Sequence, residues 1–334
     1  MYKVYGTDTK KMLNMLILEI LKMYSDENHK LTQQEILRRL KSEYGVDKCD
    51  RRTVKANVKS LKQMGIEIYA EDGEAYYLME RDLEDEELRW LIDAVLFSKV
   101  LTETQAKRLI GKLEGFGNKY FKSNVSHVAA ASGLSRTENK HVMINVSTIN
   151  EAIDKKKKIR FRYKKYGADL KMHDCGKEYT VNPYQMVATN GRYYLIGNVD
   201  KYDNASYYRI DKISNVEILD EKIKPMKEIA ELKNGLDLPK HMAEHIYMFH
   251  GESVPVYFKT TESMIDGIVD WFGKDVKITK PDKDSDEVQI RVMCNYDAMY
   301  YWALQYGPYV EIIEPQRLRD DIRKTVEDMA RKYS

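Results

Sequence analysis

The sequence predicts a multidomain α+β protein, and three observations lead to that fold class. The chain has 334 residues, more than a single hydrophobic core usually serves. Residues 1–80 carry apolar side chains at helical spacing and then a hairpin pattern. Residues 182–213 read as tyrosine-rich strands, and from residue 254 onward strand and helix patterns alternate.

Three helices and a hairpin are expected at the start of the chain. Apolar spacing predicts the first helix at residues 11–24. Thr32 and Glu35 form a capping box for a second helix, and Asp50 is a suitable N-cap for a third that ends near Gly65. With a hairpin at residues 66–78, this order is typical of a winged helix-turn-helix, a DNA-binding fold.

The third helix combines an apolar stripe with a basic remainder, which favours a nucleic-acid contact. Such a helix enters the major groove, where arginine reads guanine, asparagine reads adenine, and lysine suits phosphates. The candidate DNA-binding residues are Arg51, Arg52, Thr53, Lys55, Asn57, Lys59 and Lys62. The alternative is a solvated basic face. The carboxylates of the expected wing turn, at residues 71–74, would repel phosphates, so binding would depend on the helix.

A helical linker follows the hairpin. An acidic run at residues 82–87 favours a helix N-terminus, helical spacing continues to about residue 100, and a second helix is expected at residues 103–113. Residues 116–141 show little pattern, and residues 142–146 favour a strand. The linker is expected to carry a signal, to pack a dimer or to be a solvated spacer, and the sequence does not separate these roles.

The segment at residues 182–213 predicts a compact β unit with a binding face. Asn190-Gly191 indicates a two-residue type I′ hairpin. Residues 207–213 read as the third strand, whose alternation places Tyr207, Arg209 and Asp211 on one face. Phenol rings can stack on a planar group, and a guanidinium binds anions. The alternative is structural packing, with Arg209 paired to Asp211.

A basic run precedes this unit. After a helix expected at residues 146–154, residues 155–165 contain eight basic side chains in eleven positions. Most lysines of the run are expected to be a solubilising helix end. Arg160, Arg162 and Lys164 alternate on one strand face and would add positive field near Arg209 if the two strands are neighbours.

The last part of the chain predicts an α+β domain of ferredoxin-like character. Strands are expected at residues 254–259, 275–279, 287–293 and 310–313, with helices at 262–271, 296–306 and 315–332. Residues 225–251 before it read as helical and polar.

Two motifs carry a family resemblance. Residues 192–197 (RYYLIG) and 208–213 (YRIDKI) resemble the WYL domain, a small Sm-like, SH3-like β-barrel found in bacterial transcriptional regulators. Residues 50–55 and 76–78 resemble the winged helix that commonly precedes it, and residues 271–273, 303–307 and 314–319 resemble its C-terminal extension.

The resemblance implies a sensor of a nucleotide or nucleic-acid ligand and a homodimer that the extension helps to form. Tyr193 stands where the family has its naming tryptophan, and Ser206 and Lys212 stand where arginines are frequent, so the hold on an anion would depend on Arg209. The candidate ligand-binding residues are Tyr184, Tyr193, Tyr194, Tyr207, Arg209, Asp211, Arg160, Arg162 and Lys164.

These interpretations define five predicted segments. They are a winged helix-turn-helix at 1–80, a helical linker at 81–145, a WYL sensor barrel at 146–223, a connector at 224–250 and a C-terminal extension domain at 251–334.

Enzymatic and metal chemistry find no support in the sequence. His241 and His245 have helical spacing but lack the glutamate of a zinc-peptidase motif, and no phosphate-binding glycine loop is present. No cofactor or metal is expected. Three separated cysteines and no apolar leader indicate a cytoplasmic protein, and a net charge of +2 does not by itself announce nucleic-acid binding.

The resulting hypothesis is a DNA-binding transcriptional regulator whose operator binding responds to a sensor ligand. The alternative is an accessory RNA or single-stranded DNA binding protein that serves a nucleic-acid-targeting effector and regulates no promoter. A ligand-binding enzyme ranks third.

Overall fold

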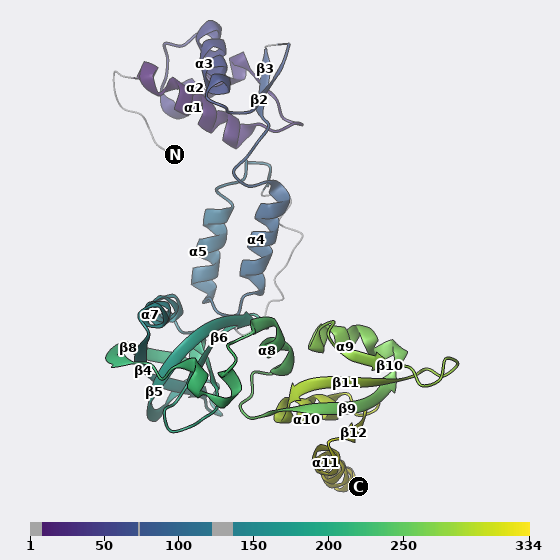
Figure 1. The fold of residues 1–334 in the computed structure, drawn as a ribbon. Helices are drawn as coiled ribbons and strands as arrows, with labels where there is room; N and C mark the ends of the chain where they lie inside the picture. The colour runs from purple at the N-terminus through teal and green to yellow at the C-terminus, as the bar shows by residue number, and fades with distance from the viewer. Residues whose placement is uncertain (1–8, 73, 122–135) are drawn as a thin grey trace. The chain divides into compact units, whose positions relative to one another are not determined.

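The computed structural model describes residues 9–72, 74–121 and 136–334 of the chain. They belong to two compact units, Met1–Lys140 and His141–Ser334 (Figure 1). Within these described ranges, no helix is both long and apolar enough to cross a membrane.

Three helices and a small antiparallel sheet begin the first unit. The elements are α1 (Thr9–Tyr24), β1 (Leu31–Thr32), α2 (Gln33–Tyr44), α3 (Arg51–Gln63), β2 (Ile68–Glu71) and β3 (Ala75–Leu78). The sheet order is β1-β3-β2. Ile17, Leu40 and Leu61, one from each helix, are buried in the same core as Ile68 and Tyr76 of the sheet. The three predicted helices and the predicted hairpin are therefore observed.

Local hydrogen bonds fix the ends of α2 and α3 where the sequence predicts them. The Thr32 hydroxyl accepts the Glu35 N–H at 3.2 Å, and the Glu35 carboxylate accepts the Thr32 N–H at 2.9 Å, which completes the capping box. Asp50 accepts the Thr53 N–H at 2.7 Å. After α2, Gly45 has a φ of 70°, a left-handed conformation that glycine adopts without penalty. These caps hold both ends of the short connection before α3.

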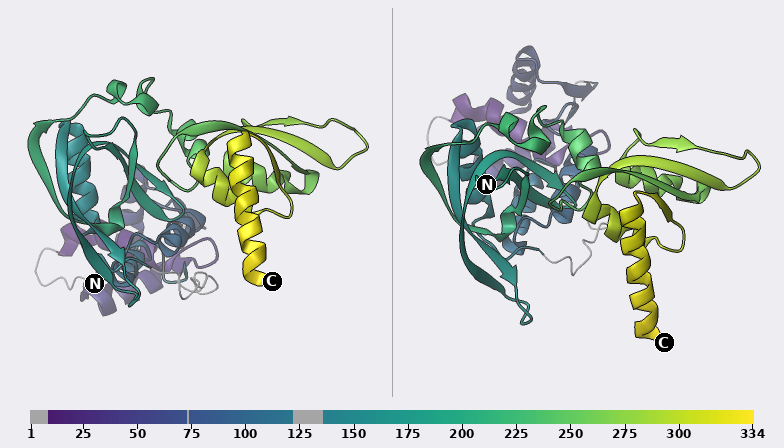
Figure 2. Two further views of the ribbon diagram at one scale, coloured as in Figure 1. Left: turned by 90° about the horizontal axis from the view of Figure 1, so that it is seen from below. Right: turned by 60° about the horizontal axis from the view of Figure 1, so that its bottom comes forward.

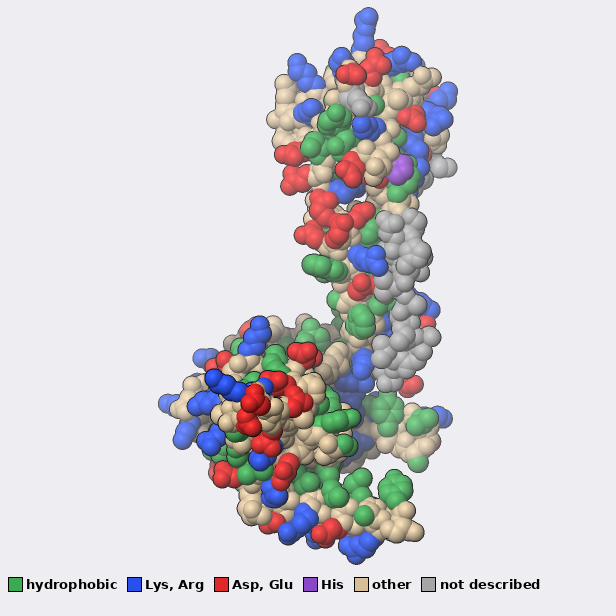
Figure 3. Space-filling model, turned by 90° about the vertical axis from the view of Figure 1, so that its right-hand side faces the viewer, with side chains coloured by type: hydrophobic (Ala, Val, Ile, Leu, Met, Phe, Trp, Pro, Cys, Tyr) green, Lys and Arg blue, Asp and Glu red, His purple; other side chains and the backbone are tan. Residues whose placement is uncertain are grey.

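Two linker helices complete the first unit. They are α4 (Asp85–Phe97) and α5 (Glu103–Leu113), which share a small core of Leu88, Ile92 and Phe121. Figure 3 shows acidic side chains gathered at the N-terminal end of the linker, where the first turn of α4 is acidic. Residues 122–135, part of the segment predicted to lack pattern, lie outside the described residues.

The linker is joined to the first three helices by polar contacts. The Arg81 guanidinium donates to the carbonyl oxygen of Lys22 at 2.8 Å and to that of Ser25. The Asn118 amide donates to Asp26 at 2.9 Å. The described parts of the first unit therefore connect through side chains as well as through the chain itself.

The second unit opens with a helix where a strand was expected. Residues 142–146 belong to α7 (Val142–Asp154), so the strand prediction there was wrong. The buried side chains Val142, Asn145, Ile149 and Ala152 recur at helical spacing, and the Asn145 amide donates to the Ile213 carbonyl at 2.8 Å. A short apolar run fits a strand or a buried helix equally well, and here tertiary packing decides for the helix.

A five-stranded antiparallel sheet follows. Its members are β4 (Lys157–Tyr166), β5 (Met172–Thr189), β6 (Arg192–Asn198), β7 (Ser206–Arg209) and β8 (Ile213–Lys222). The sheet order is β7-β6-β5-β4-β8. Asn190 and Gly191 have φ values of 51° and 72°, as the predicted type I′ turn requires. The long β5 belongs to both halves of the sheet, because it pairs with β4 through one end and with β6 through the other.

The third predicted strand is shorter than expected. β7 ends at Arg209, and Ile210–Lys212 forms a 3-10 turn, so the simple strand alternation through Asp211 was wrong. The turn brings the Asp211 carboxylate onto the Arg209 guanidinium.

The sheet curls so that its edge strand meets β4. The Tyr208 ring of β7 makes edge-on contacts with Phe161 and Tyr163 of β4, at centroid distances of 5.1 and 5.9 Å. The Arg209 N–H donates to the Tyr163 hydroxyl at 3.2 Å. Tyr179 of β5 joins the same group of rings. The aromatic side chains therefore form the inside of the curl.

A connector leads to the last domain. Residues 225–251, read as helical and polar, contain two 3-10 turns, Met226–Glu228 and Ala230–Leu232, and one short helix, α8 (Leu238–Glu244). Pro239 lies in the first turn of α8, and Asp237 caps it by accepting the Lys240 N–H at 3.3 Å.

The last domain has the predicted order of strands and helices. Its elements are β9 (Ser253–Thr261), α9 (Ile265–Phe272), β10 (Lys277–Thr279), β11 (Glu287–Asn295), α10 (Tyr296–Gln305), β12 (Glu311–Glu314) and α11 (Gln316–Tyr333). The antiparallel sheet has the order β10-β11-β9-β12. Trp302, Phe258 and Phe272 meet in its core. Figure 2 shows α11 extending beyond the sheet, and Leu318 is its one buried residue.

Candidate functional site

The exposed face of α3 is the strongest concentration of unpaired positive charge that the sequence predicted. Val54, Val58 and Leu61 turn inward, which leaves the basic side chains outside. The exposed cations are Arg51, Arg52, Lys55, Lys59 and Lys62. In the described part of the chain, none of them forms an ion pair with a carboxylate. A row of unneutralised cations on one helix face suits a polyanion.

Two polar residues of this helix are already engaged. The Arg51 guanidinium donates to the Gln34 side chain at 3.0 Å, which ties α3 to α2. The Asn57 amide donates to the Thr53 carbonyl at 2.8 Å, one turn earlier. The second N–H and the carbonyl oxygen of this amide are the groups that would remain for adenine. Thr53 is half-buried, and its backbone N–H is held by Asp50.

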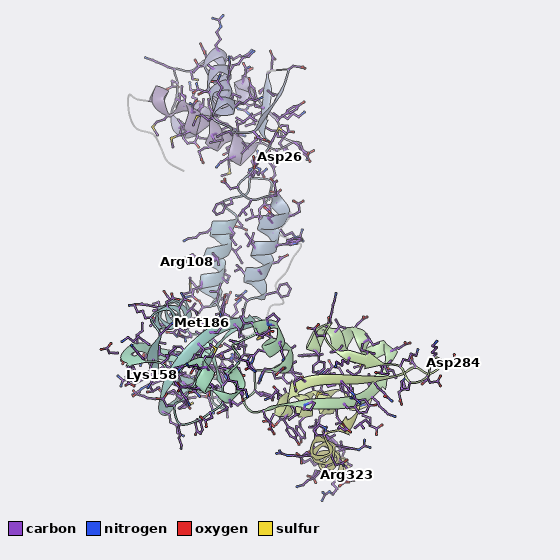
Figure 4. The ribbon with its side chains drawn as sticks, viewed as in Figure 1. Asp26, Arg108, Lys158, Met186, Asp284 and Arg323 are labelled. Carbon is purple, nitrogen blue, oxygen red and sulfur yellow. The ribbon has the colours of Figure 1, made fainter. Side chains whose placement is uncertain are left out.

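The basic run at residues 155–165 is largely neutralised by carboxylates. Lys158, labelled in Figure 4, lies 2.8 Å from Asp200 and 2.9 Å from Glu221. Arg160 lies 2.7 Å from Glu217, and Arg162 pairs with Asp174 and Glu178. The sequence predicted these cations but not the carboxylates that pair with them. Those carboxylates come from β5, β8 and a loop.

Arg160, Arg162 and Lys164 do not extend the predicted binding face. As a strand, β4 pairs with β5 and β8 and not with β7. The rings of Phe161 and Tyr163 point into the curl, whereas Arg160 and Arg162 are exposed. The prediction that these residues add positive field near Arg209 assumed that the two strands are neighbours, and the sheet order does not meet that condition.

Arg209 is held by a nearly buried carboxylate. Its Nε and Nη2 donate to the two oxygens of Asp211 at 3.1 and 2.7 Å. Arg192 of β6 donates to the same carboxylate at 3.0 Å. The Asp211 side chain is 5% exposed, against 22% for Arg209 and 16% for Arg192. The ion pair that the sequence offered as the structural alternative is thus present.

Positive charge nevertheless remains in excess here. Lys212 follows Asp211, is half-buried and makes no ion pair within the described residues. Burial and the neighbouring Arg209 and Arg192 guanidinium groups lower the pKa of Lys212, although Asp211 opposes them. We call Arg192, Arg209, Asp211 and Lys212 the basic cluster. Its three cations and one carboxylate have a formal net charge of +2, which favours an anion.

The predicted tyrosines separate into two groups. Tyr193 is 39% exposed, and Tyr194 pairs with Arg209 across the sheet. Tyr184 is buried and donates its hydroxyl to the Lys224 carbonyl at 2.8 Å, so it serves the core in this structure. Tyr207 is also buried, and burial raises its pKa.

Tyr207 joins the sheet to the connector through three histidines. Its hydroxyl oxygen lies 2.9 Å from Nε2 of His241 and 3.4 Å from Nε2 of His245. The His250 ring stacks on the Tyr207 ring. Burial lowers the pKa of His241 and of His250, and burial together with His241 lowers that of His245 to about 4. We call these four residues the histidine cluster. No group of three or more metal-ligating side chains with suitable geometry is found in the described residues.

A cavity of about 520 Å³ opens beside the histidine cluster. It is lined mostly by apolar atoms, and its aromatic walls include Tyr163, Tyr179, Tyr202 and Tyr208. Tyr207 and His250 of the histidine cluster also line it. The sequence prediction included only Tyr207 of this set. The period-2 pattern of β4 contains the missing signal, because it places Phe161 and Tyr163 opposite the arginines.

The fold and these sites define a multidomain α+β protein. A basic helix lies in the N-terminal part of the sequence, and a curled sheet with aromatic and cationic side chains follows later in the sequence. Residues 145–218 match the WYL domain family, and residues 252–330 match the WCX domain family. The chain therefore contains a WYL domain followed by a WCX domain.

Comparison with solved structures adds two likenesses. Proteasome accessory factor B/C (PafBC) of Arthrobacter aurescens is 15% identical, with a TM-score of 0.30, and the match covers 99% of this chain and 50% of that one. A structure described as a CRISPR Cas-related protein is 16% identical, with a TM-score of 0.37, over 99% of this chain and 88% of that one. The chain thus spans about half the length of the PafBC structure. Comparison with the curated proteins found no match.

Proposed function

We propose that the chain is a DNA-binding transcriptional regulator with a ligand sensor, and that it is not an enzyme. In this proposal the three N-terminal helices and their sheet are a winged helix-turn-helix, and the curled five-stranded sheet is an Sm-like barrel. The winged domain binds operator DNA, and the sensor binds a nucleotide or nucleic-acid ligand. The sensor ligand acts by having unequal affinity for DNA-competent and DNA-incompetent states.

The observation that carries the DNA-binding half is the unpaired basic face of α3. The helix is capped at both ends, its apolar stripe is fully packed, and its cations project where no carboxylate neutralises them. In the WYL domain, by contrast, most exposed cations of β4 are paired. Charge that stays unpaired on a rigid element is available to phosphates and base edges.

The test measures duplex binding at several salt concentrations. The double variant Arg52→Ala/Lys55→Ala should weaken binding to the DNA upstream of the chain's own gene. If both side chains contact phosphates, the slope of log K against log salt should fall by about 1.8. The matched control is Lys157→Ala/Arg160→Ala, which removes two cations that are ion-paired with Asp220 and Glu217. Equal effects of the two double variants would remove the assignment of α3 as the reader.

The basic cluster supports the sensor half. An anion placed there would meet three cations, which come from the start of β6, the end of β7 and the 3-10 turn after β7. Arg209→Ala should abolish the effect of a nucleotide or short single strand on duplex binding and leave duplex binding itself intact. A response that survives in Arg209→Ala would contradict the assignment of the sensor site.

We also propose a homodimer. The outer half of α11 carries Val326, Met329 and Tyr333 on its surface, with exposures of 52%, 45% and 89%. Substituting aspartate at Val326 and Met329 should shift the sedimentation coefficient to that of a monomer. A wild-type chain that sediments as a monomer at every concentration contradicts this part of the proposal.

The second candidate function is an accessory protein that binds RNA or single-stranded DNA for an effector. The acidic turn between β2 and β3 favours it, because exposed Asp72 and Glu74 would repel a duplex at the place where wings commonly contact phosphates. Tight single-strand binding that persists after charge reversal at Arg51 and Arg52 would support this candidate over the first.

A further inference from the structure

We propose that the tyrosine-lined cavity between β4, β5 and β7 is a nucleobase site and that the adjoining basic cluster holds the phosphate of the same nucleotide. This inference rests on the proposed sensor function and names its ligand class: a nucleoside 5′-monophosphate, free or at the end of a strand. It is argued from the cavity, its neighbours and their charges.

The size and the walls of the cavity suit a flat, largely apolar ring. A volume of about 520 Å³ lies within the range of small-molecule sites, roughly 300–1,000 Å³. Tyr163, Tyr179 and Tyr208 meet edge to face at centroid distances of 5.7 to 6.2 Å, which fixes their rings against one another. Tyr202 also lines the cavity and is 51% exposed. Lys201 Nζ lies over its ring, 5.6 Å from the centroid, so a bound ring would stack on the opposite face. Nucleobases bind proteins by such stacking.

The polar groups of the cavity select against other flat ligands. Asn204 and Ser206 supply hydrogen-bonding groups, and none of the described residues that line the cavity is a carboxylate. Lys165 is the one lysine or arginine among these described lining residues, and its charge also acts on Lys212 of the basic cluster. A flat ligand without a negative charge would therefore leave the charges of Lys165 and Lys212 without an anionic partner. A ligand that also carries an anionic group suits the site better.

One residue places the cavity beside the phosphate site. Tyr163 lines the cavity, and its hydroxyl accepts the backbone N–H of Arg209. The Arg209 charge also acts on the Tyr163 hydroxyl, so a base packed against Tyr163 would lie near Arg209, the proposed phosphate ligand. That arrangement matches a nucleotide, in which a sugar separates base and phosphate.

Occupancy would also reach the rest of the protein. Tyr207 and His250 line the cavity and belong to the histidine cluster. In this cluster, His241 comes from α8 and His250 from the loop before β9. A bound base would therefore touch the groups that join the sensor sheet to the connector.

The experiment is calorimetric titration of the full chain with AMP, GMP, CMP and UMP, each compared with its nucleoside and with ribose 5-phosphate. A 5′-phosphorylated dinucleotide distinguishes a free nucleotide from a strand end. Tyr202→Ala should weaken binding of the preferred nucleotide by about 5- to 150-fold, the loss of one stacked base. Tyr202→Trp should retain it, and Tyr309→Ala, an equally exposed tyrosine of the WCX domain, should change nothing. Lys212→Ala should weaken the nucleotide and leave the nucleoside unaffected.

Binding of a nucleotide or the dinucleotide with this variant pattern supports the inference. If none of these probes binds at millimolar concentration, or if Tyr202→Ala and Tyr309→Ala bind alike, the cavity is not the base site. The proposed function has its own readout: loss of duplex binding in Arg52→Ala/Lys55→Ala would stand even when the cavity assignment fails. If a ligand alters duplex binding equally in wild type and Tyr202→Ala, the proposed sensor function stands, but the cavity is not its base site.

Discussion

Protonation of His245 should destabilise the second unit between pH 7.5 and pH 5. His245 Nδ1 lies 3.3 Å from the Phe249 carbonyl and donates to it, which leaves Nε2 as an acceptor for the Tyr207 hydroxyl. The Tyr207 oxygen in turn accepts from His241. A second proton on His245 would place two donors against each other in a buried cluster, so the folded state favours neutral histidine.

The magnitude follows from the pKa difference. Burial and His241 lower the pKa of His245 from 6.5 to about 4 in the folded state. The unfolded chain therefore binds more protons below pH 6.5, and stability is lost as the pH falls toward 4. Between pH 7.5 and pH 5 the linkage relation gives a loss of about 2 kcal/mol. For a unit of this size that corresponds to a decrease of about 4–8 °C in melting temperature.

The assay is urea and thermal unfolding of wild type and His245→Gln at both pH values, followed by circular dichroism. Glutamine keeps a polar side chain and does not titrate, so the variant should lose about 2 kcal/mol less than wild type on acidification. Subtracting the loss measured for His245→Gln from the loss measured for wild type removes the contribution of other titrating groups. One of these is Glu231, whose pKa is raised by burial. His173→Gln, at an exposed histidine, is the control and should behave as wild type. An equal acid sensitivity of His245→Gln and wild type would refute the reasoning.

Three further predictions concern the caps, the glycine and the ion pair that hold the sites. Asp50→Ala removes the cap of α3 and should lower the unfolding free energy of the first unit by about 0.5–2 kcal/mol, measured in urea, whereas Asp50→Asn should cost far less. Gly197→Ala should cost about 1–3 kcal/mol, because the added Cβ would lie 2.6 Å from a Val181 methyl and 2.8 Å from a backbone carbonyl; a wild-type melting temperature would contradict this packing. Asp211→Asn leaves two guanidinium groups without their shared anion and should cost about 1–3 kcal/mol, and a stabilised variant would show that the carboxylate is not their anchor.

Local signals made much of this fold predictable. The capping box at Thr32, the cap at Asp50 and the turn at Asn190-Gly191 act over a few residues, so the sequence contains everything they need. The alternation of strands and helices in the last domain was predictable for the same reason. The strand predicted at residues 142–146 was wrong, because a five-residue apolar run does not reveal which partner will cover it.

The site depended more on distant partners. Arg160 and Lys158 looked like a basic surface until Glu217 and Asp200 came beside them, more than forty positions away in sequence. Lys212 was read only as a position where the family often has an arginine, and the 3-10 turn that places it directly after Asp211 was not predicted. The histidines dismissed as metal ligands form a buried hydrogen-bonded cluster with Tyr207, a pairing that helical spacing alone does not indicate.

In the proposed sensor, Asp211 would also determine which solutes the curled sheet ignores. Asp211 is a carboxylate tethered to the same chain, and it occupies the guanidinium groups of Arg192 and Arg209. A dissolved anion must therefore compete with a carboxylate whose effective concentration is about millimolar or higher. A chloride ion or a simple carboxylate offers the guanidinium groups nothing that Asp211 does not already supply. A ligand gains only by bringing a second negative charge or by reaching Lys212 at the same time, as a phosphoryl group does. The buried aspartate would thus work as a threshold against the abundant monovalent anions of the cell.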